Sequence, residues 1–270
     1  MFHVLGGVPE NTMIRKGRLR CQGPFSHPIM AGVFWASLLP WLGGIWYGKF
    51  ASKSRVMLYM ICIFIIVANT ASSTPIMVIL FTVLGFMAFK VRHQMRMMRK
   101  LLFIFLVTLH FAMKAPIWDL ISRIDLSGGS TGWHRSNLIQ QSINHFNEWW
   151  MVGTLSTRHW AFGMQDMTNQ YLLEGVRGGI VGMILFITFI KRTYGILGEA
   201  QRKAASKSDL WILWASGVML FTHTMSFFAA AYFGQTNIAF FLLTGASVSV
   251  AATVINDAKQ AAKEKLRIKG

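Results

Sequence analysis

The sequence predicts an all-α protein, a polytopic transmembrane helix bundle of about seven spans with an external loop that carries amphipathic helices. Hydrophobic residues make up 53% of its 270 residues and charged residues only 14%, which is more apolar than a soluble domain. The apolar residues also stand in long blocks, near the ~17–25 residues with which a helix crosses ~30 Å of hydrocarbon. Runs such as LYMICIFIIVA, moreover, lack the polar stripe of a surface helix.

The apolar blocks define the expected spans. They lie at about 28–48, 56–72, 75–90, 101–118, 172–190, 210–232 and 236–254. The second and third blocks are short and meet at ANTASSTP, which predicts a tight helical hairpin. Pro75 suits the first turn of the second arm, because the N–H that proline lacks has no helical partner there.

The net charge of +17 would point to nucleic acid in a soluble protein, but its placement indicates membrane orientation. Lysine and arginine gather at 49–55, 90–100, 191–207 and 259–269. With seven spans these segments all lie on one face, which the positive-inside rule makes the cytoplasm. The expected order is an external segment 1–27, four transmembrane helices in 28–118, an external loop 119–171, three transmembrane helices in 172–254 and a basic cytoplasmic tail 255–270.

The external loop is too rich in large apolar side chains for a disordered segment. Five of them suit one face of an amphipathic helix: Leu138, Ile139, Ile143, Phe146 and Trp150. Trp149 and Trp150 would then rest at the level of the lipid headgroups. The loop is therefore expected to form one or two amphipathic helices over the external mouth of the bundle.

Several arginines outside the cytoplasmic segments, among them Arg20, Arg135 and Arg158, disobey the positive-inside rule. Arginine suits a diphosphate because its planar fork makes paired, charge-assisted hydrogen bonds. The acidic residues of the external side are scattered, unlike the clustered carboxylates of a Mg²⁺ site. We therefore expect no metal and no cofactor, with protein cations neutralising a leaving diphosphate.

Three stretches resemble the bacterial O-antigen ligases and O-antigen polymerases. RCQGPFSHPIMAG resembles the family stretch in which an arginine and a small turn precede a membrane helix. GSTGWHRSNLIQQSI resembles its second arginine at the start of a loop helix, and GMQDMTNQYLLEGVRGGIVGMILF its later glycine-rich motif. The resemblance covers about residues 15–235 and implies a multi-pass, metal-independent glycosyltransferase of the bacterial inner membrane. The expected topology places the polar residues 1–27 outside with no apolar segment to carry them across, so we also expect that the family's N-terminal helices once preceded this chain.

Such an enzyme moves a glycan from undecaprenyl diphosphate to an acceptor sugar on the periplasmic side. By the resemblance, Arg20 matches the first family arginine and Arg135 the second, and both would hold the lipid diphosphate. We add three further substrate-binding candidates, His27, Arg158 and Asn169. The expected partners are the lipid-linked glycan, an acceptor glycan or lipid, and membrane lipids, with no nucleic acid.

The family's catalytic histidine stands directly before the asparagine of its last loop motif, and Thr168 occupies that position here. Threonine cannot act as a base near neutral pH, so we expect Asp166 or His159 to take the proton. Each candidate also has a structural interpretation. Arg20 would contact headgroups, His27 would stand at a helix entry, Arg135 would be a solvated charge, and Asp166 and Asn169 would cap a helix.

The i, i+3 spacing predicts an ion pair between Glu174 and Arg177 and a contact between His145 and Glu148 on one helix face. His223 lies inside an apolar span, which predicts a buried, hydrogen-bonded histidine. For function, the leading hypothesis is a polymerase or ligase of surface polysaccharide assembly. A catalytically inactive membrane scaffold is the alternative that the missing family histidine favours. A transporter is less favoured, because the sequence shows neither inverted repeats nor paired intramembrane charges.

Overall fold

The computed structural model describes residues 13–15, 17–114, 118 and 132–269. Within these residues the regular structure is helical apart from two strands of two residues each. The chain divides into two compact units. Unit 1 comprises 1–83, 187–226 and 232–270, and unit 2 comprises 84–186 and 227–231.

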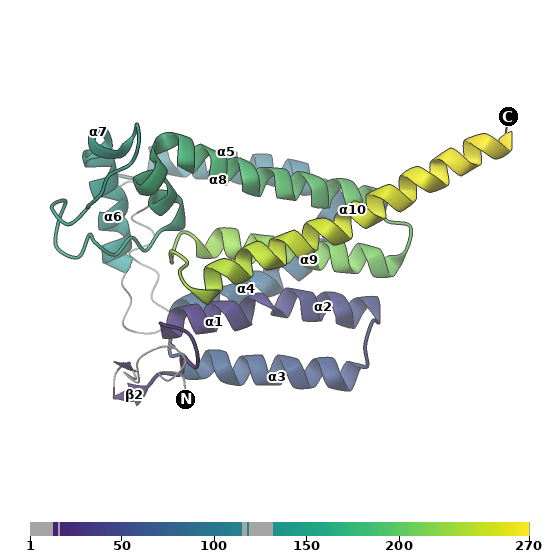
Figure 1. Ribbon diagram of the computed structural model, residues 1–270, viewed down its shortest axis with the longest axis horizontal. Helices are drawn as coiled ribbons and strands as arrows, with labels where there is room; N and C mark the ends of the chain where they lie inside the picture. Colours follow the sequence, from purple (N-terminus) through teal and green to yellow (C-terminus); the bar gives the residue numbers. More distant parts are fainter. Residues whose placement is uncertain (1–12, 16, 115–117, 119–131, 270) are drawn as a thin grey trace. The chain divides into compact units, whose positions relative to one another are not determined.

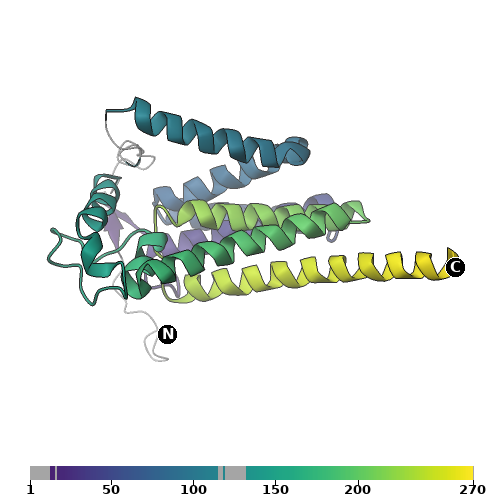
Figure 2. The same ribbon diagram turned by 90° about the horizontal axis from the view of Figure 1, so that it is seen from above.

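Unit 1 holds most of the helices that the sequence predicts (Figure 1). They are α1 (Pro28–Ser37), α2 (Leu39–Gly48), α3 (Lys53–Asn69), most of α4 (Ser73–Met87), the second half of α8 (Gln170–Lys203), α9 (Lys207–Ser226) and α10 (Gln235–Lys269). The helices α9 and α10 lie side by side, and α10 extends beyond the end of α9 (Figure 2). The basic tail is therefore a continuation of the last helix.

Small residues let α2 and α9 pack closely. A Cβ atom added to Gly44 would lie 2.6 Å from the Cβ of Ala215, so the two backbones approach where a larger residue would clash. One turn further, the rings of Tyr47 and Trp211 stack with centroids 4.5 Å apart. This face of α2 is therefore buried against protein.

The hairpin expected at ANTASSTP is present. The helix α3 ends at Asn69 and α4 begins at Ser73, so three residues make the turn. Pro75 lies in the first turn of α4, and Gly32 of α1 packs against it so closely that an added Cβ would lie 2.4 Å from its ring.

His223 is buried and hydrogen-bonded, as predicted. Its side chain is 1% exposed, and Nδ1 lies 2.9 Å from the hydroxyl of Tyr232. Phe240 packs edge-on against the same ring. The surroundings are those of a structural histidine inside a helix bundle.

Unit 2 holds a 3-10 helix η1 (Ala88–Gln94), α5 (Met95–Ala112), α6 (Gly132–Asn144), α7 (Phe146–Trp149) and the first half of α8. Its core joins α6, α7, the loop after α7 and α8. The buried apolar members are Leu138, Trp149, Trp160, Met164, Met167 and Val176.

The loop expected to carry amphipathic helices does form α6 and α7, but the buried face differs from the prediction. Leu138 is buried, whereas Ile143, Phe146 and Trp150 are exposed. Trp149, expected at the headgroups, is instead buried and donates its indole N–H to the carbonyl of Ser142 at 2.8 Å. The turn between α6 and α7 rotates the second helix, so the helical spacing does not continue across it.

Helical stretches long and apolar enough to cross a membrane occur at Pro28–Gly48, Ser73–Ala112, Gln170–Lys203 and Gln235–Arg267. They indicate a membrane protein. Every expected block contains a helix, although 70–72, 113–114 and 227–232 lie outside the helices. The helices α3 and α9 are not among these four stretches. The expected blocks 75–90 and 101–118 fall into the single stretch Ser73–Ala112, which is bent at Val91 in η1.

Candidate functional site

The site residues predicted from the sequence fall into both units. Unit 1 holds Arg20 and His27. Unit 2 holds Arg135, Arg158, His159, Asp166 and Asn169. The two groups are described separately.

Arg20 is buried and holds the turn between α3 and α4. Its Nε donates to the carbonyl of Thr70 at 2.9 Å, and Nη2 donates to the hydroxyl of Ser72. The side chain is only 8% exposed. Burial lowers the pKa of the Arg20 guanidinium, and the positive charge of Arg15 lowers it further. A cation at the carboxyl end of a helix is favoured by the helix dipole.

The residues beside Arg20 complete the same attachment. The N–H of Cys21 donates to the carbonyl of Asn69 at 2.8 Å, and Arg15 donates to the carbonyl of Ala71 at 3.3 Å. Arg15 belongs to a short hairpin of β1 (Ile14–Arg15) and β2 (Arg18–Leu19). Arg15, Arg20 and Cys21 are therefore attached to carbonyl groups at the end of α3 and in the turn that follows it.

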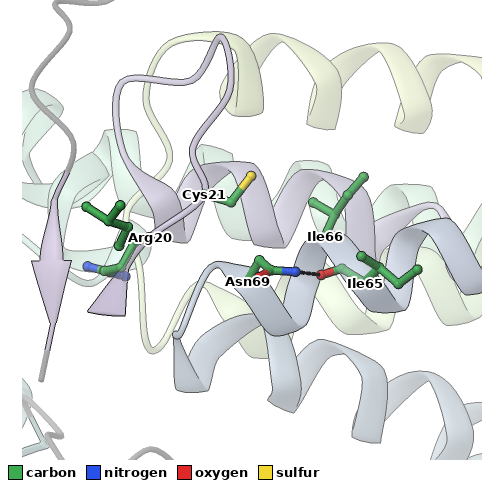
Figure 3. A pocket seen from close by; sticks show the side chains of 6 residues that line it. Arg20, Cys21, Ile65, Ile66 and Asn69 are labelled. Atoms are coloured by element: carbon green, nitrogen blue, oxygen red, sulfur yellow. Dashed lines mark hydrogen bonds between the residues drawn. The ribbon is translucent and has the colours of Figure 1, made fainter. Parts of the chain in front are cut away.

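A shallow pocket of about 380 Å³ lies beside this attachment (Figure 3). Its walls are Leu19, Arg20 and Cys21 on one side and Ile65, Ile66 and Asn69 of α3 on the other. The lining is mainly apolar, because Arg20 directs two of its nitrogens to the α3–α4 turn. Arg20 thus has a structural role that accounts for its burial.

His27 caps the start of α1. Its Nδ1 accepts a hydrogen bond from the N–H of Ile29 at 3.1 Å, and its ring packs edge-on near Phe233. The interpretation of His27 as a helix-entry residue is therefore confirmed.

In unit 2, a polar network centres on Glu148 of α7. The Oε2 atom of Glu148 accepts a hydrogen bond from His159 Nε2 at 2.6 Å and one from Trp160 Nε1 at 2.9 Å. His145 completes the group, with its ring stacked on Trp160 at a centroid distance of 5.2 Å. We call these four residues, His145, Glu148, His159 and Trp160, the Glu148 cluster.

The chemistry of the cluster follows from its hydrogen bonds. The bond from Trp160 lowers the pKa of the Glu148 carboxyl, and the bond and positive charge available from His159 act in the same direction. An ionised carboxylate only accepts, so the proton of neutral His159 resides on Nε2 and Nδ1 carries the lone pair. The His159 side chain is 56% exposed, so this oriented base is accessible.

The other cationic candidates lie around the same segment. Arg158 is exposed, directly before His159. Arg135 lies in the first turn of α6, next to His134, whose Nε2 donates to the carbonyl of Asp166 at 3.4 Å. The start of α6 is thereby brought to the Asp166 segment. Asp166 is exposed, and no hydrogen bond joins it to His159 among the described residues.

Asn169 caps α8. It is buried, and its Oδ1 accepts a hydrogen bond from the N–H of Leu172 at 3.2 Å, as a helix N-cap does. Within the described residues, Glu174 pairs with Gln170, which donates to it at 2.6 Å, and not with Arg177. The expected Glu174–Arg177 ion pair is therefore wrong, and the Glu174 carboxylate accepts from the residue one turn before it instead.

The Glu148 cluster is the feature that the sequence patterns missed. Spacing alone paired Glu148 with His145, whereas the structure pairs it with His159 and Trp160, beyond the turn at Gly153. No local signal reports such a pairing, because it depends on how the loop folds back on α7. The only advance sign was the adjacency of His159 and Trp160, a base and an aromatic donor.

In the part of the chain that the structure describes, no group of three or more His, Cys, Asp or Glu side chains is placed to hold a metal ion.

Comparisons of the chain with known proteins found no matching family model, no matching curated protein and no matching solved structure.

Proposed function

We propose that the protein is a membrane glycosyltransferase that moves a glycan from an undecaprenyl-diphosphate carrier to an acceptor sugar. It would act on the periplasmic face of the bacterial inner membrane as a polymerase or ligase of surface polysaccharide. The observation that carries the proposal is the hydrogen bond between His159 and Glu148. It orients an accessible base, beside Arg158, in a polar segment that lies between membrane-type helices.

In this reaction the acceptor hydroxyl attacks the anomeric carbon of the donor sugar, and the bond to the diphosphate oxygen breaks. His159 Nδ1 takes the hydroxyl proton, and the Glu148 carboxylate stabilises the imidazolium that forms. The leaving diphosphate keeps the bonding electron pair. Arg135, which the resemblance implies, and Arg158 are the proposed partners for its developing charge.

The direct test supplies the purified protein in detergent with a lipid-linked oligosaccharide and an acceptor. Release of undecaprenyl diphosphate together with a longer or transferred glycan is the expected result. His159→Gln should lower the rate by about 10²–10⁴-fold, the usual contribution of a general base. Lys203→Gln, which removes an exposed helix pair elsewhere, is the matched control and should leave the rate unchanged. A carrier that stays intact under all conditions would reject the proposal.

Lysine variants distinguish bidentate hydrogen bonding by Arg135 and Arg158 from a general effect of positive charge. Arg135→Lys and Arg158→Lys should slow transfer nearly as much as the alanine variants, because a lysine point charge cannot copy the bidentate fork. Equal activity of the lysine variants and the wild type would mean that these arginines supply only a general positive field.

The two candidate bases differ in their response to acid. As the pH falls, a histidine base is protonated and loses activity before an aspartate base does. The rate profile of the wild type, compared with Asp166→Asn and His159→Gln, therefore assigns the proton acceptor. A profile that the His159 substitution does not alter would transfer the role to Asp166.

The polysaccharide of a deletion strain distinguishes the two forms of the reaction. Loss of chain length with one unit still attached indicates a polymerase. Loss of attachment, with polymer accumulating on the lipid carrier, indicates a ligase.

A further inference from the structure

Helix α8 is interrupted inside its apolar stretch, and residues 150–154 form hydrogen bonds with the main chain at the interruption. Gly178 (φ −129°, ψ 17°) and Gly179 (φ 66°, ψ −170°) depart from helical geometry. In an unbroken helix the N–H of Ile180 would donate to the carbonyl of Val176. Here Ile180 donates to the carbonyl of Trp150 at 2.7 Å, and the Val176 carbonyl accepts from the N–H of Thr154 at 2.8 Å.

The segment after α7 therefore supplies both halves of the missing helical hydrogen bond. Glycines bring the two backbones together. A Cβ added to Gly153 would lie 2.4 Å from the Val176 carbonyl oxygen, and one added to Gly179 would lie 2.4 Å from the Met151 carbonyl oxygen. Trp149 packs against Gly175 in the same way, 2.7 Å from where its Cβ would be. The position of residues 150–154 along α8 is thus fixed by main-chain contacts.

The side chains that this segment turns outward are apolar. Trp150 is 40% exposed, Met151 63% and Val152 79%. Just beyond the break, α8 also exposes apolar residues, namely Val181, Ile184 and Leu185. These belong to a stretch that is long and apolar enough to cross a membrane. Exposed apolar side chains therefore occur on both of the segments that the hydrogen bond between Ile180 and Trp150 joins.

The position along α8 gives the depth of the segment. Ile180 precedes the cationic pair Lys191–Arg192 by eleven residues, or ~17 Å at ~1.5 Å per residue. The hydrocarbon core is ~30 Å thick. If Lys191 lies near one boundary of the core, the break lies in the opposite leaflet. Water is scarce there, and an unpaired backbone group costs several kcal/mol, which the exchange of hydrogen bonds avoids.

We propose that Trp150, Met151 and Val152 form a lipid-inserted wedge, a re-entrant element held within that leaflet by the break in α8. Its partner is the bilayer itself. The wedge anchors the loop of the Glu148 cluster to the membrane, because the same loop continues from Gly153 to His159. This inference does not depend on the reaction proposed above.

The test measures depth with spin labels on the full-length protein in liposomes of phosphatidylethanolamine and phosphatidylglycerol. The background carries Cys21→Ser and Cys62→Ala, since both native cysteines are exposed. Single cysteines are introduced at Val152, at Leu185 as the lipid-facing reference and at Gln165 as the water-facing reference. Collisions with oxygen, which dissolves in lipid, are compared with collisions with a water-soluble nickel chelate.

The expected result is that the label at 152 loses most of its collisions with the nickel chelate and falls on the Leu185 side of the midpoint between the references. A label at 152 on the Gln165 side of that midpoint would overturn the proposal. Met151→Cys repeats the measurement at an adjacent position, so a misfolded variant at 152 does not end the test. Labels at 151 and 152 should both fall on the Leu185 side of the midpoint.

Discussion

Two helix interruptions, one in each unit, are closed by different chemistry. At the α3–α4 turn of unit 1, long cationic side chains reach the free carbonyl groups, chiefly Arg20 to Thr70. At the Gly178–Gly179 break in unit 2, the main chain of residues 150–154 exchanges hydrogen bonds with α8. The hydrogen bonds at the α3–α4 turn are lost when the arginine side chain is substituted. The hydrogen bonds at the α8 break form between main-chain groups that glycine allows to approach, so an added Cβ atom disrupts them.

The role of an arginine or a glycine therefore depends on the groups that surround it in the fold. Arg20 has the residue type that binds a diphosphate, yet two of its nitrogens already donate within the protein. The glycines near 178 look like a membrane-helix motif, yet Gly179 is required because its φ of 66° and the nearby Met151 carbonyl leave no room for a Cβ. The following variants test this contrast, from the largest expected effect to the smallest.

Gly179→Ala should be the most damaging substitution. The backbone conformation at Gly179 is accessible almost only to glycine, and the new Cβ would meet a backbone oxygen, so we expect a loss of more than about 3 kcal/mol. Gly178→Ala is the matched control, because its φ is negative and nothing lies within 4 Å of the added Cβ. Thermal unfolding in detergent measures both. Similar midpoints for the two variants would contradict the described break.

Arg20→Ala should destabilise unit 1 by about 1.5–3 kcal/mol, since it removes charge-assisted hydrogen bonds to a buried turn. Arg20→Lys should recover part of this loss, because lysine can still donate to one carbonyl. The control is Arg18→Ala in the same hairpin, whose side chain is exposed and should change stability by less than about 0.5 kcal/mol.

The Arg20 variants also distinguish a structural role of this residue from a role in the reaction. Glycan transfer by Arg20→Ala is measured at a temperature where the variant remains folded. Retained activity would leave Arg20 with its structural role alone. Lost activity in a folded variant would support the additional role in diphosphate binding.

Asn169→Ala should cost about 0.5–2 kcal/mol, the range for removing a helix N-cap. Asn169→Ser preserves an oxygen that can accept from the N–H of Leu172, so it should remain close to the wild type in stability. The two midpoints are compared in the same detergent. If Asn169→Ser is folded but inactive, the amide itself contacts substrate.

The smallest effect concerns the Glu148 cluster and depends on pH. The pKa of Glu148 is lowered in the folded protein by hydrogen bonds from Trp160 and His159. Its stabilising contribution is therefore complete above the ordinary glutamate value of about 4.3 and is lost as pH falls through the lower folded value. Glu148→Gln should be less stable than the wild type at pH 7, and the difference should shrink towards pH 3. A difference that stays constant with pH would mean that Glu148 is not ionised in the cluster.

Much of the fold could be predicted from local patterns. Block length and apolarity located each expected helix where the structure describes it, and Pro75 together with the short ANTASSTP turn located the α3–α4 hairpin. These features depend on the sequence within a few residues of each position. The capping roles of His27 and Asn169 belong to the same class, because a cap contacts the helix that follows it directly.

Long-range pairing could not be predicted in this way. The burial of Trp149 in place of Phe146 and Trp150 follows from the turn between α6 and α7. The pairing of Glu148 with His159 rather than His145, and the closing of α8 by residues 150–154, depend on the chain reversal after α7. Hydrophobic periodicity carries no information on such a reversal. It reports which residues share a helix face, and the turn after α6 changes the face.

The sequence by itself determined that this is a helical protein with membrane-type segments and a polar, cation-rich loop, because helix length, hydrophobicity and charge are properties of consecutive residues. Only the tertiary structure decided which of the polar groups are used in hydrogen bonds that hold the fold and which remain accessible. Arg20 is directed to the α3–α4 turn and Asn169 to the start of α8, whereas His159 is oriented by Glu148 and remains accessible. The physical reason is that a hydrogen bond forms between groups that folding brings within about 3 Å, at any separation along the chain.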